Sequence, residues 1–381
     1  MPSHRPYYLR TARIDAGLSN VSLEEELAYW HAEAKSIWEL SEASAERLDA
    51  DVCAQGARVE MKRRDFLWTC AAVVGAATLP ACRSGGGWRE DPIRLDAAAF
   101  RVSRRFVATS FGRIAYVERG SGPAALFLHG FPMSGFQWRG SLERLARHRR
   151  CLAPDFMGLG YSEVPEQQAL SPQAQADTLA AFLDALSIPA VDLLADDSGG
   201  MVAQLFVVQH PARVRTLLLT NCDVHENSPP PQMRNSIAMA RAGLYDQKIV
   251  RHLDDRVYAR SPSGIGGSAY MDPANLTDEE IEYCFRPLVS SLLRRAQLNR
   301  SLAAFESNPL LAIEPVLRRC TTPTRMVWGT ADKLFPVVWA EWLDRTLPQS
   351  RGVRRVEGGK LFWLEEKPDV IADEARALWN V

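Results

Sequence analysis

An acidic residue stands where a strand is expected to turn into a helix, and this placement could make it a nucleophile. The apolar residues 191–195 predict a buried strand, and apolar residues at helical spacing after Met201 predict a helix that ends before Pro211. Between them, the segment ADDSG at 195–199 has small residues two positions before and two positions after Asp197. That spacing is typical of a nucleophile elbow, where strand and helix pack closely. An Asp at the tip would attack an electrophilic carbon and form an ester with it.

Two other interpretations of this segment stay open. The Asp197 carboxylate could instead cap the helix that follows, as Asp commonly does at a helix start. A shift of one residue would make Ser198 the nucleophile, flanked by Asp196 and Gly200. That frame puts an acidic side chain where a small residue is needed, so the sequence favours Asp197 at the tip.

The composition restricts the possible partners. The chain has 381 residues, which is enough for one large α/β domain plus an extension. Its formal net charge is -1. No part of it forms a basic stripe, which argues against a nucleic-acid partner. Its 7 cysteines form no C-x-x-C pair and have no zinc-ligand spacing. We therefore expect a small-molecule substrate or ligand, no metal and no cofactor.

Strand and helix patterns alternate from residue 100 onward, which predicts an α/β fold. We expect a mostly parallel sheet with helices on both faces. Apolar runs predict an opening hairpin and six further strands, with helices between them. The hairpin is expected at 106–108 and 114–117, the strands at 125–128, 152–154, 191–195, 214–220, 325–328 and 353–356, and two of the helices at 174–186 and 337–347.

The alternation breaks between about 223 and 317, directly after the sixth predicted strand. Three prolines at 229–231 open a helical region that is rich in Leu, Met and Tyr. An insertion at this point lies over the carboxyl ends of the strands, where open α/β sheets bind ligands. The sequence therefore predicts a helical cap that supplies most of an apolar pocket wall.

The amino-terminal part carries a pattern typical of an export signal. Arg63 and Arg64 precede an apolar run at 68–78, and the segment LPAC at 79–82 resembles a bacterial lipobox. The pattern predicts twin-arginine export and a lipidated Cys82 that anchors the protein to the membrane of the cell envelope. A cytoplasmic protein with a short core helix at this position is the alternative.

These features divide the chain into four parts. The signal occupies 61–82 and a Gly-rich linker 83–99, which leaves 100–381 as the folded domain. Residues 1–60 contain one helical pattern and precede the place where a signal normally begins. They are either a gene-model artefact, with the true start at Met61, or a genuine extension before a signal that does not function.

The folded domain resembles the α/β-hydrolase superfamily, and in particular its haloalkane dehalogenase and epoxide hydrolase branch. The resemblance covers about 100–381 and implies the capped α/β-hydrolase fold. Any one of its motifs alone is weak, but together they are specific. They are HGFP at 129–132, PDFMGLGYS at 154–162, the elbow ADDSGG at 195–200 and WGTADKLFP at 328–336.

The resemblance implies a role for each matching residue. Asp197 would be the nucleophile, and Asp332 would be the acid that orients a general base. The backbone N–H groups of Phe131 and Ser198 would form the oxyanion hole. His129 is expected to brace its loop by hydrogen bonds and to take no part in proton transfer.

The base itself is missing from the expected place. In the family a catalytic histidine precedes the motif EExP, and the spacing puts Leu361 at that position. No histidine follows His252. The candidate for a relocated base is His225, which follows the sixth strand on the rim that carries Asp197; a plain loop residue at the cap hinge is the other interpretation. Without a histidine to orient, Asp332 is also compatible with an ordinary turn residue.

Two further expectations concern the reaction. The dehalogenases hold the departing halide with an aromatic N–H after the nucleophile, and Ser198 stands at that position. Epoxide hydrolases use cap tyrosines to protonate the opened ring, for which the candidates are Tyr245, Tyr258, Tyr270 and Tyr283. The first hypothesis is thus a hydrolase acting on a small apolar epoxide, ester or halide. The second is a catalytically impaired binding protein or scaffold at the envelope.

Overall fold

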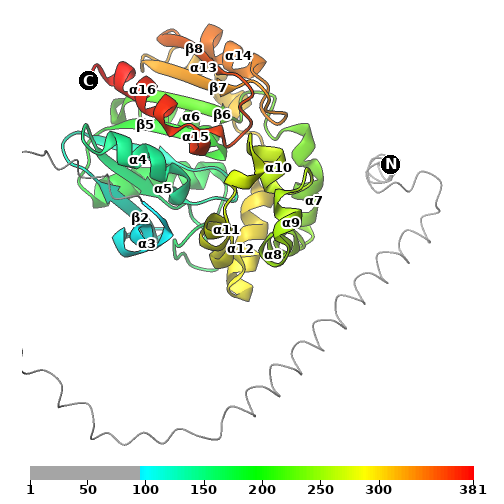
Figure 1. Ribbon diagram of the computed structural model, residues 1–381. Helices are drawn as coiled ribbons and strands as arrows, with labels where there is room; N and C mark the ends of the chain where they lie inside the picture. Colours follow the sequence, from blue (N-terminus) through cyan, green and yellow to red (C-terminus); the bar gives the residue numbers. More distant parts are fainter. Residues whose placement is uncertain (1–94) are drawn as a thin grey trace, which may run out of the picture. The chain divides into compact units, whose positions relative to one another are not determined.

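The computed structural model describes residues 95–381 (Figure 1). The predictions for 1–60, for the signal at 61–82 and for Cys82 fall outside the described residues. The linker predicted over 83–99 ends earlier than expected, because Leu95 is already buried and a helix, α3 (Ala97–Ser103), begins two residues later. The Asp96 side chain caps that helix by accepting a hydrogen bond from the backbone N–H of Ala99.

One mostly parallel sheet of eight strands organises the domain, as the alternating pattern predicted. Its strand order is β1-β2-β4-β3-β5-β6-β7-β8, and only the pairs β1–β2 and β2–β4 are antiparallel. The strands are β1 (Arg104–Thr109), β2 (Gly112–Arg119), β3 (Ala124–Leu128), β4 (Arg150–Pro154), β5 (Val191–Asp197), β6 (Val214–Cys222), β7 (Thr324–Gly329) and β8 (Ser350–Val356).

The centre of the sheet positions the site. Every residue of β3 and β5 is buried, as expected for parallel strands covered on both faces. Helix α6 (Ser198–Gln209) follows β5 directly, and α5 (Pro172–Ala185) and α13 (Leu310–Leu317) pack on it. The other helices that flank the sheet are α4 (Arg139–Leu145), α14 (Val338–Thr346), α15 (Trp363–Glu366) and α16 (Pro368–Trp379).

A helical cap follows β6, as predicted, and its helices gather at one end of the domain (Figure 1). The predicted end at 317 is too late, because α13 packs on α6 and so belongs to the sheet layer. The cap helices are α7 (Arg234–Arg241), α8 (Tyr245–Asp254), α9 (Arg256–Arg260), α10 (Ile265–Ala269), α11 (Asp278–Phe285) and α12 (Leu292–Ala303). Within residues 95–381, no helix combines the length and apolar character needed to cross a bilayer.

Short 3-10 helices join several of these elements. They are η1 (Gly135–Trp138), η2 (Pro211–Arg213), η3 (Pro231–Met233), η4 (Pro273–Asn275), η5 (Arg286–Val289) and η6 (Ala304–Glu306). Two of them lie beside residues that face the site: η3 leads into the first cap helix, and η6 ends the cap.

Candidate active site

Asp197 occupies a sharp turn between β5 and α6. Its backbone has φ 51° and ψ -128°, a left-handed region that is unfavourable for a residue with a side chain. The first turn of α6 lies against β3, so that a Cβ at Gly199 would lie 2.6 Å from the carbonyl oxygen of Leu128. Close packing of strand and helix therefore explains the small residue two positions after the acid, and it places Asp197 at the tip.

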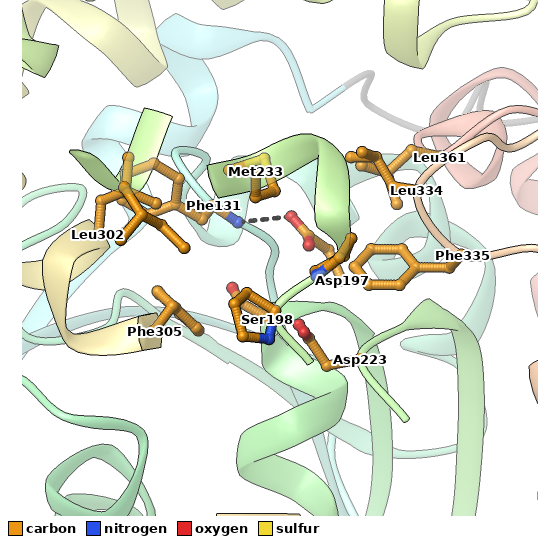
Figure 2. A pocket seen from close by; sticks show the side chains of 13 residues that line it. Phe131, Asp197, Ser198, Asp223, Met233, Leu302, Phe305, Leu334, Phe335 and Leu361 are labelled. Carbon is orange, nitrogen blue, oxygen red and sulfur yellow. Dashed lines mark hydrogen bonds between the residues drawn. The ribbon is translucent and has the colours of Figure 1, made fainter. Parts of the chain in front are cut away.

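The loop after β3 holds one oxygen of this carboxylate. The backbone N–H of Phe131 donates a hydrogen bond of 2.9 Å to Asp197 Oδ2 (Figure 2). A Cβ at Gly130 would lie 2.6 Å from the same oxygen, so only glycine permits this approach. The backbone N–H of Ser198 also favours the ionised form of Asp197. Both predicted oxyanion-hole donors thus face the carboxylate.

Asp196 has a different task from its neighbour. It is fully buried, and its Oδ2 accepts a hydrogen bond of 2.9 Å from Gln137 Nε2, while Thr220 donates to its other oxygen. Gln137 Oε1 in turn accepts the backbone N–H of Gly130 at 2.8 Å. Asp196 thereby ties the loop that carries the oxyanion-hole donor to β5. The frame with Ser198 as nucleophile would not use this geometry.

His129 braces the same loop. Its Nε2 accepts the backbone N–H of Phe156 at 3.0 Å, and its Nδ1 lies 2.8 Å from the carbonyl oxygen of Gly130. Burial lowers the pKa of the ring, which keeps the histidine neutral. Both ring nitrogens are occupied, so this histidine has no free nitrogen for proton transfer at the cavity.

Asp197 faces a small cavity of about 60 Å³ between the sheet and the cap (Figure 2). The polar side chains in its lining belong to Asp197, Ser198 and Asp223. None of the lining residues carries a side-chain N–H that could hold a halide ion. The apolar wall comes from Phe131, Leu334, Phe335 and Leu361 on the sheet side and from Pro229, Pro230, Met233, Ile237, Leu302 and Phe305 after β6.

Leu361 occupies the position where the resemblance predicts a histidine. Leu361 is 5% exposed and lines the cavity, and no histidine is among the lining residues. The loop that carries Leu361 is joined to the loop that carries Asp332, because Ala331 N–H donates to the carbonyl oxygen of Gly359 at 2.8 Å. This hydrogen bond holds the loop after β7 and the loop after β8 together.

Asp332 is buried and only half paired. Its Oδ1 accepts the backbone N–H of Leu334 at 2.8 Å, whereas its Oδ2 has no hydrogen-bond partner among the described residues. Burial raises the pKa of Asp332 to about 6, against the effects of the Leu334 and Phe335 N–H groups and of the Asn221 side chain. The charge of Asp332 also raises the pKa of Asp197, so the two carboxylates are close enough to interact.

His225 does not line the cavity. Its Nε2 lies 2.9 Å from Glu314 Oε2, and its ring stacks on Trp342 with centroids 4.6 Å apart. Its backbone has φ 48°, which fits a tight turn at the start of the cap. These contacts agree with a residue of the cap hinge and do not bring the ring to Asp197.

The four cap tyrosines are also absent from the cavity lining. Tyr270 and Tyr283 are engaged elsewhere, the first donating to Glu365 and the second accepting from Arg104. Tyr258 packs edge-on against the His252 ring. Tyr245 lies nearest the site: its ring centroid is 5.7 Å from that of Phe131, and the charge of Asp197 helps to raise its pKa.

Sequence analysis assigned no role to Asp223, an acidic residue of the cavity lining. It lines the cavity beside Asp197, and burial followed by the charge of Asp197 raises its pKa well above the ordinary value. Its position could have drawn attention, since it directly follows β6, the neighbour of β5 at the carboxyl edge of the sheet. Within residues 95–381, no group of three or more His, Cys, Asp and Glu side chains is arranged to hold a metal ion.

A parallel sheet with a strained acidic elbow, an oxyanion-hole loop and a cap over the carboxyl edge defines the class of the protein. The sequence profile of the alpha/beta hydrolase fold matches residues 123–367. The chain belongs to the α/β-hydrolase family, and its relatives place it in the haloalkane dehalogenase and epoxide hydrolase branch, among the hydrolases.

The named relatives are distant but cover most of the folded domain. Haloalkane dehalogenase 2 of Mycobacterium tuberculosis is 26% identical over 300 residues, which cover 73% of this chain and 95% of that protein. Cis-3-alkyl-4-alkyloxetan-2-one decarboxylase of Xanthomonas campestris is 24% identical and covers 69% of this chain and 91% of its own length. A solved epoxide hydrolase superposes with a TM-score of 0.61 at 22% identity, covering 73% of this chain and 98% of that structure.

Proposed function

We propose that the protein is a hydrolase in which Asp197 attacks a small, largely apolar electrophile and holds it as a covalent ester. The observation that carries the proposal is the geometry of Asp197 itself. A strained elbow aims its carboxylate into an apolar cavity, and the Phe131 N–H binds one oxygen. Strain of this kind is kept where function requires it.

The two oxygens of Asp197 have separate roles in this mechanism. Oδ2 is held by the N–H of Phe131 and becomes the carbonyl oxygen of the ester. Oδ1 is then the oxygen that attacks the carbon. When water adds to the ester, negative charge develops on Oδ2, and the same N–H stabilises it.

The cavity lining bears on the leaving group. A departing halide needs N–H donors, and no side-chain N–H lines the cavity. An oxygen that leaves from a strained ring stays attached to the substrate and needs only a proton. We therefore favour epoxides and related strained rings over haloalkanes. The relatives named for epoxide hydrolysis and for oxetanone decarboxylation are consistent with this preference.

The absence of a histidine base slows the second half of the reaction. A positioned general base typically contributes about 10²–10⁴-fold to the rate, and Leu361 cannot accept a proton. We expect the Asp197 ester to form faster than it is hydrolysed. The second candidate function, a ligand-binding protein without turnover, is favoured by this same substitution.

Intact-mass analysis tests the proposal directly. The protein is exposed to a panel of small epoxides, alkyl halides and esters, and the peptide that gains mass is identified by tandem mass spectrometry. We expect a stoichiometric adduct on Asp197 with an epoxide and none in the near-isosteric variant Asp197→Asn. A protein that binds panel members but gains no mass with any of them, even after Leu361→His, would be a binding protein.

A further inference from the structure

Asp223 is placed beside the nucleophile by the register of the sheet. In the β5–β6 pair, Asp197 lies opposite Cys222, so Asp223 comes one residue beyond that partner. Neighbouring strands are about 4.8 Å apart, which brings the two acidic residues to adjacent positions. Both line the same cavity (Figure 2).

The backbone of Asp223 is fixed to the helix that starts at the nucleophile. Gln204 Nε2 donates to the carbonyl oxygen of Asp223 at 2.8 Å and to that of Gly200 at 3.0 Å. Gln204 is itself buried in α6, so the distance between the Asp197 turn and Asp223 does not depend on the cap. This is the kind of rigid support that a reacting group requires.

Within residues 95–381, the side chain of Asp223 has no ion-pair partner. It is 3% exposed, and its Oδ1 has no hydrogen-bond partner there, while the Ser228 side chain and the Asp223 backbone N–H favour its carboxylate. The buried Asp192, by contrast, is paired with Arg149 and Arg215. A buried carboxyl group without a cation is favoured in its protonated form.

The two carboxyl groups at the cavity therefore differ chemically. Asp197 has backbone N–H donors that favour its carboxylate, and burial raises its pKa to about 7. Asp223 is next to that charge, and its pKa is raised well above the ordinary value. The N–H of Phe131 favours the carboxylate on Asp197, so the proton stays on Asp223 when the two groups share one. Pairs of acids whose surroundings separate their pKa values are a common source of acid and base roles.

We propose that Asp223 is the proton donor and acceptor of this site, taking over the proton transfers for which the absent histidine leaves no other group in the cavity lining. The inference rests on the proposed function of Asp197 and narrows its substrates to strained cyclic ethers. In the first half-reaction Asp197 Oδ1 attacks a ring carbon and the ring C–O bond breaks. The ring oxygen takes the proton from Asp223, leaving a hydroxyalkyl ester on Asp197 and a carboxylate on Asp223.

The second half-reaction uses that carboxylate as a base. Asp223 takes a proton from water, and the water oxygen adds to the ester carbonyl carbon. The oxyanion on Asp197 Oδ2 is held by the N–H of Phe131. As the intermediate collapses, the ester C–O bond breaks, the leaving alkoxide takes the proton from Asp223, and a diol departs. The proton left on Asp197 returns to Asp223, so the sum is epoxide plus water to diol.

Removal of the Asp223 carboxyl group tests the inference. The variants are Asp223→Asn and Asp223→Ala in the full chain, with 1,2-epoxybutane as the substrate. Glu226→Gln is the matched control, because Glu226 is an exposed acid in the same loop and does not line the cavity. We expect diol formation to fall by about 10²-fold or more in both Asp223 variants and to stay unchanged in the control.

Chemical rescue separates proton transfer from a structural effect. Sodium formate can occupy the space vacated in Asp223→Ala, and we expect it to restore diol formation in proportion to its concentration while leaving Asp223→Asn unaffected. Turnover that survives in Asp223→Ala, or a loss that formate does not relieve, would overturn the inference while the Asp197 ester still forms. Absence of both an Asp197 ester and diol formation in the unmodified protein would overturn the proposed function and this inference together.

Discussion

The polar groups on the two sides of Asp197 differ in how fully they are hydrogen-bonded. On the nucleophile side the polar groups are paired: Phe131 N–H with Asp197, Gly130 N–H with Gln137, and Gln137 with Asp196. On the side where the resemblance predicts a base, called the base side below, Leu361 lines the cavity, and Asp332 Oδ2 is buried without a hydrogen-bond partner among the described residues.

The difference shows that the two halves of such a site are held by separate parts of the fold. The nucleophile side depends on β3, β5 and α6, which form the buried centre of the sheet. The base side depends on the loops after β7 and β8. A change in the second set leaves the first intact, although a buried and unpartnered carboxylate costs stability.

The largest effect on turnover is expected from introducing a histidine at position 361. Leu361→His should raise steady-state turnover of 1,2-epoxybutane by about 10²-fold, because Asp332 Oδ2 is available to orient the new ring. Leu361→Gln is the control for polarity without basicity. Equal rates for the two variants would show that Asp332 does not support a base at this position.

The ionisation of Asp197 should determine how the rate of ester formation depends on pH. Only the carboxylate of Asp197 attacks, and burial raises its pKa to about 7. The single-turnover rate of ester formation should therefore rise about tenfold for each pH unit below 7 and level off above it. Rapid-quench mass spectrometry from about pH 5 to about pH 9 measures this profile. A flat profile would contradict attack by Asp197.

The unpaired acid on the base side should lower stability at neutral pH. The pKa of Asp332 is about 6 when folded, above its ordinary value of 3.8, so ionisation favours the unfolded state. Stability should fall as pH rises between these two values and stay reduced above 6. Asp332→Asn should recover on the order of 1–3 kcal/mol at neutral pH and little below about pH 4.

Chemical denaturation at the two pH values measures this gain. The control is Asp254→Asn, which alters an exposed acid of α8 and should leave the free energy of unfolding unchanged at both. A variant of Asp332 that is equally stable or less stable at neutral pH would show that its second oxygen has a favourable partner.

The smallest effect is expected at His225. Its contacts with Glu314 and Trp342 lie away from the cavity lining, so His225→Ala should change turnover by less than about twofold, with a modest loss of stability. Steady-state kinetics together with thermal unfolding checks both quantities. Abolished turnover in a normally stable variant would make His225 a relocated base.

Local patterns were sufficient for much of this architecture. The small residues around Asp197 predicted the elbow, because backbone packing there admits little else, and the apolar runs predicted where the strands fall along the chain. Their ends were less certain: the chain is already packed at Leu95, and α13 returns to the sheet layer before the predicted end of the cap. Asp96 before α3 and Asn308-Pro309 before α13 mark where these helices begin, but such residues do not tell which layer the helix joins.

The site was less predictable where long-range pairing decides the outcome. Asp223 joins the cavity because β6 lies beside β5 in a given register, and one sequence does not state that register. Tyr270 and Tyr283 had the right residue type for a cap acid, but Glu365 and Arg104 bind their hydroxyl groups. His225 is drawn toward Glu314 for the same reason.

The glycines around Asp197 limit which residues the site can accept. A Cβ at Gly130 would meet Asp197 Oδ2 at 2.6 Å, and one at Gly200 would meet the Cβ of Cys222 at 2.3 Å. A side chain therefore does not fit at either position in this backbone. Leu361 contributes to the cavity through its side chain instead. The space open to a substrate is consequently bounded on one side by backbone that admits no Cβ and on the other by side chains such as Leu361.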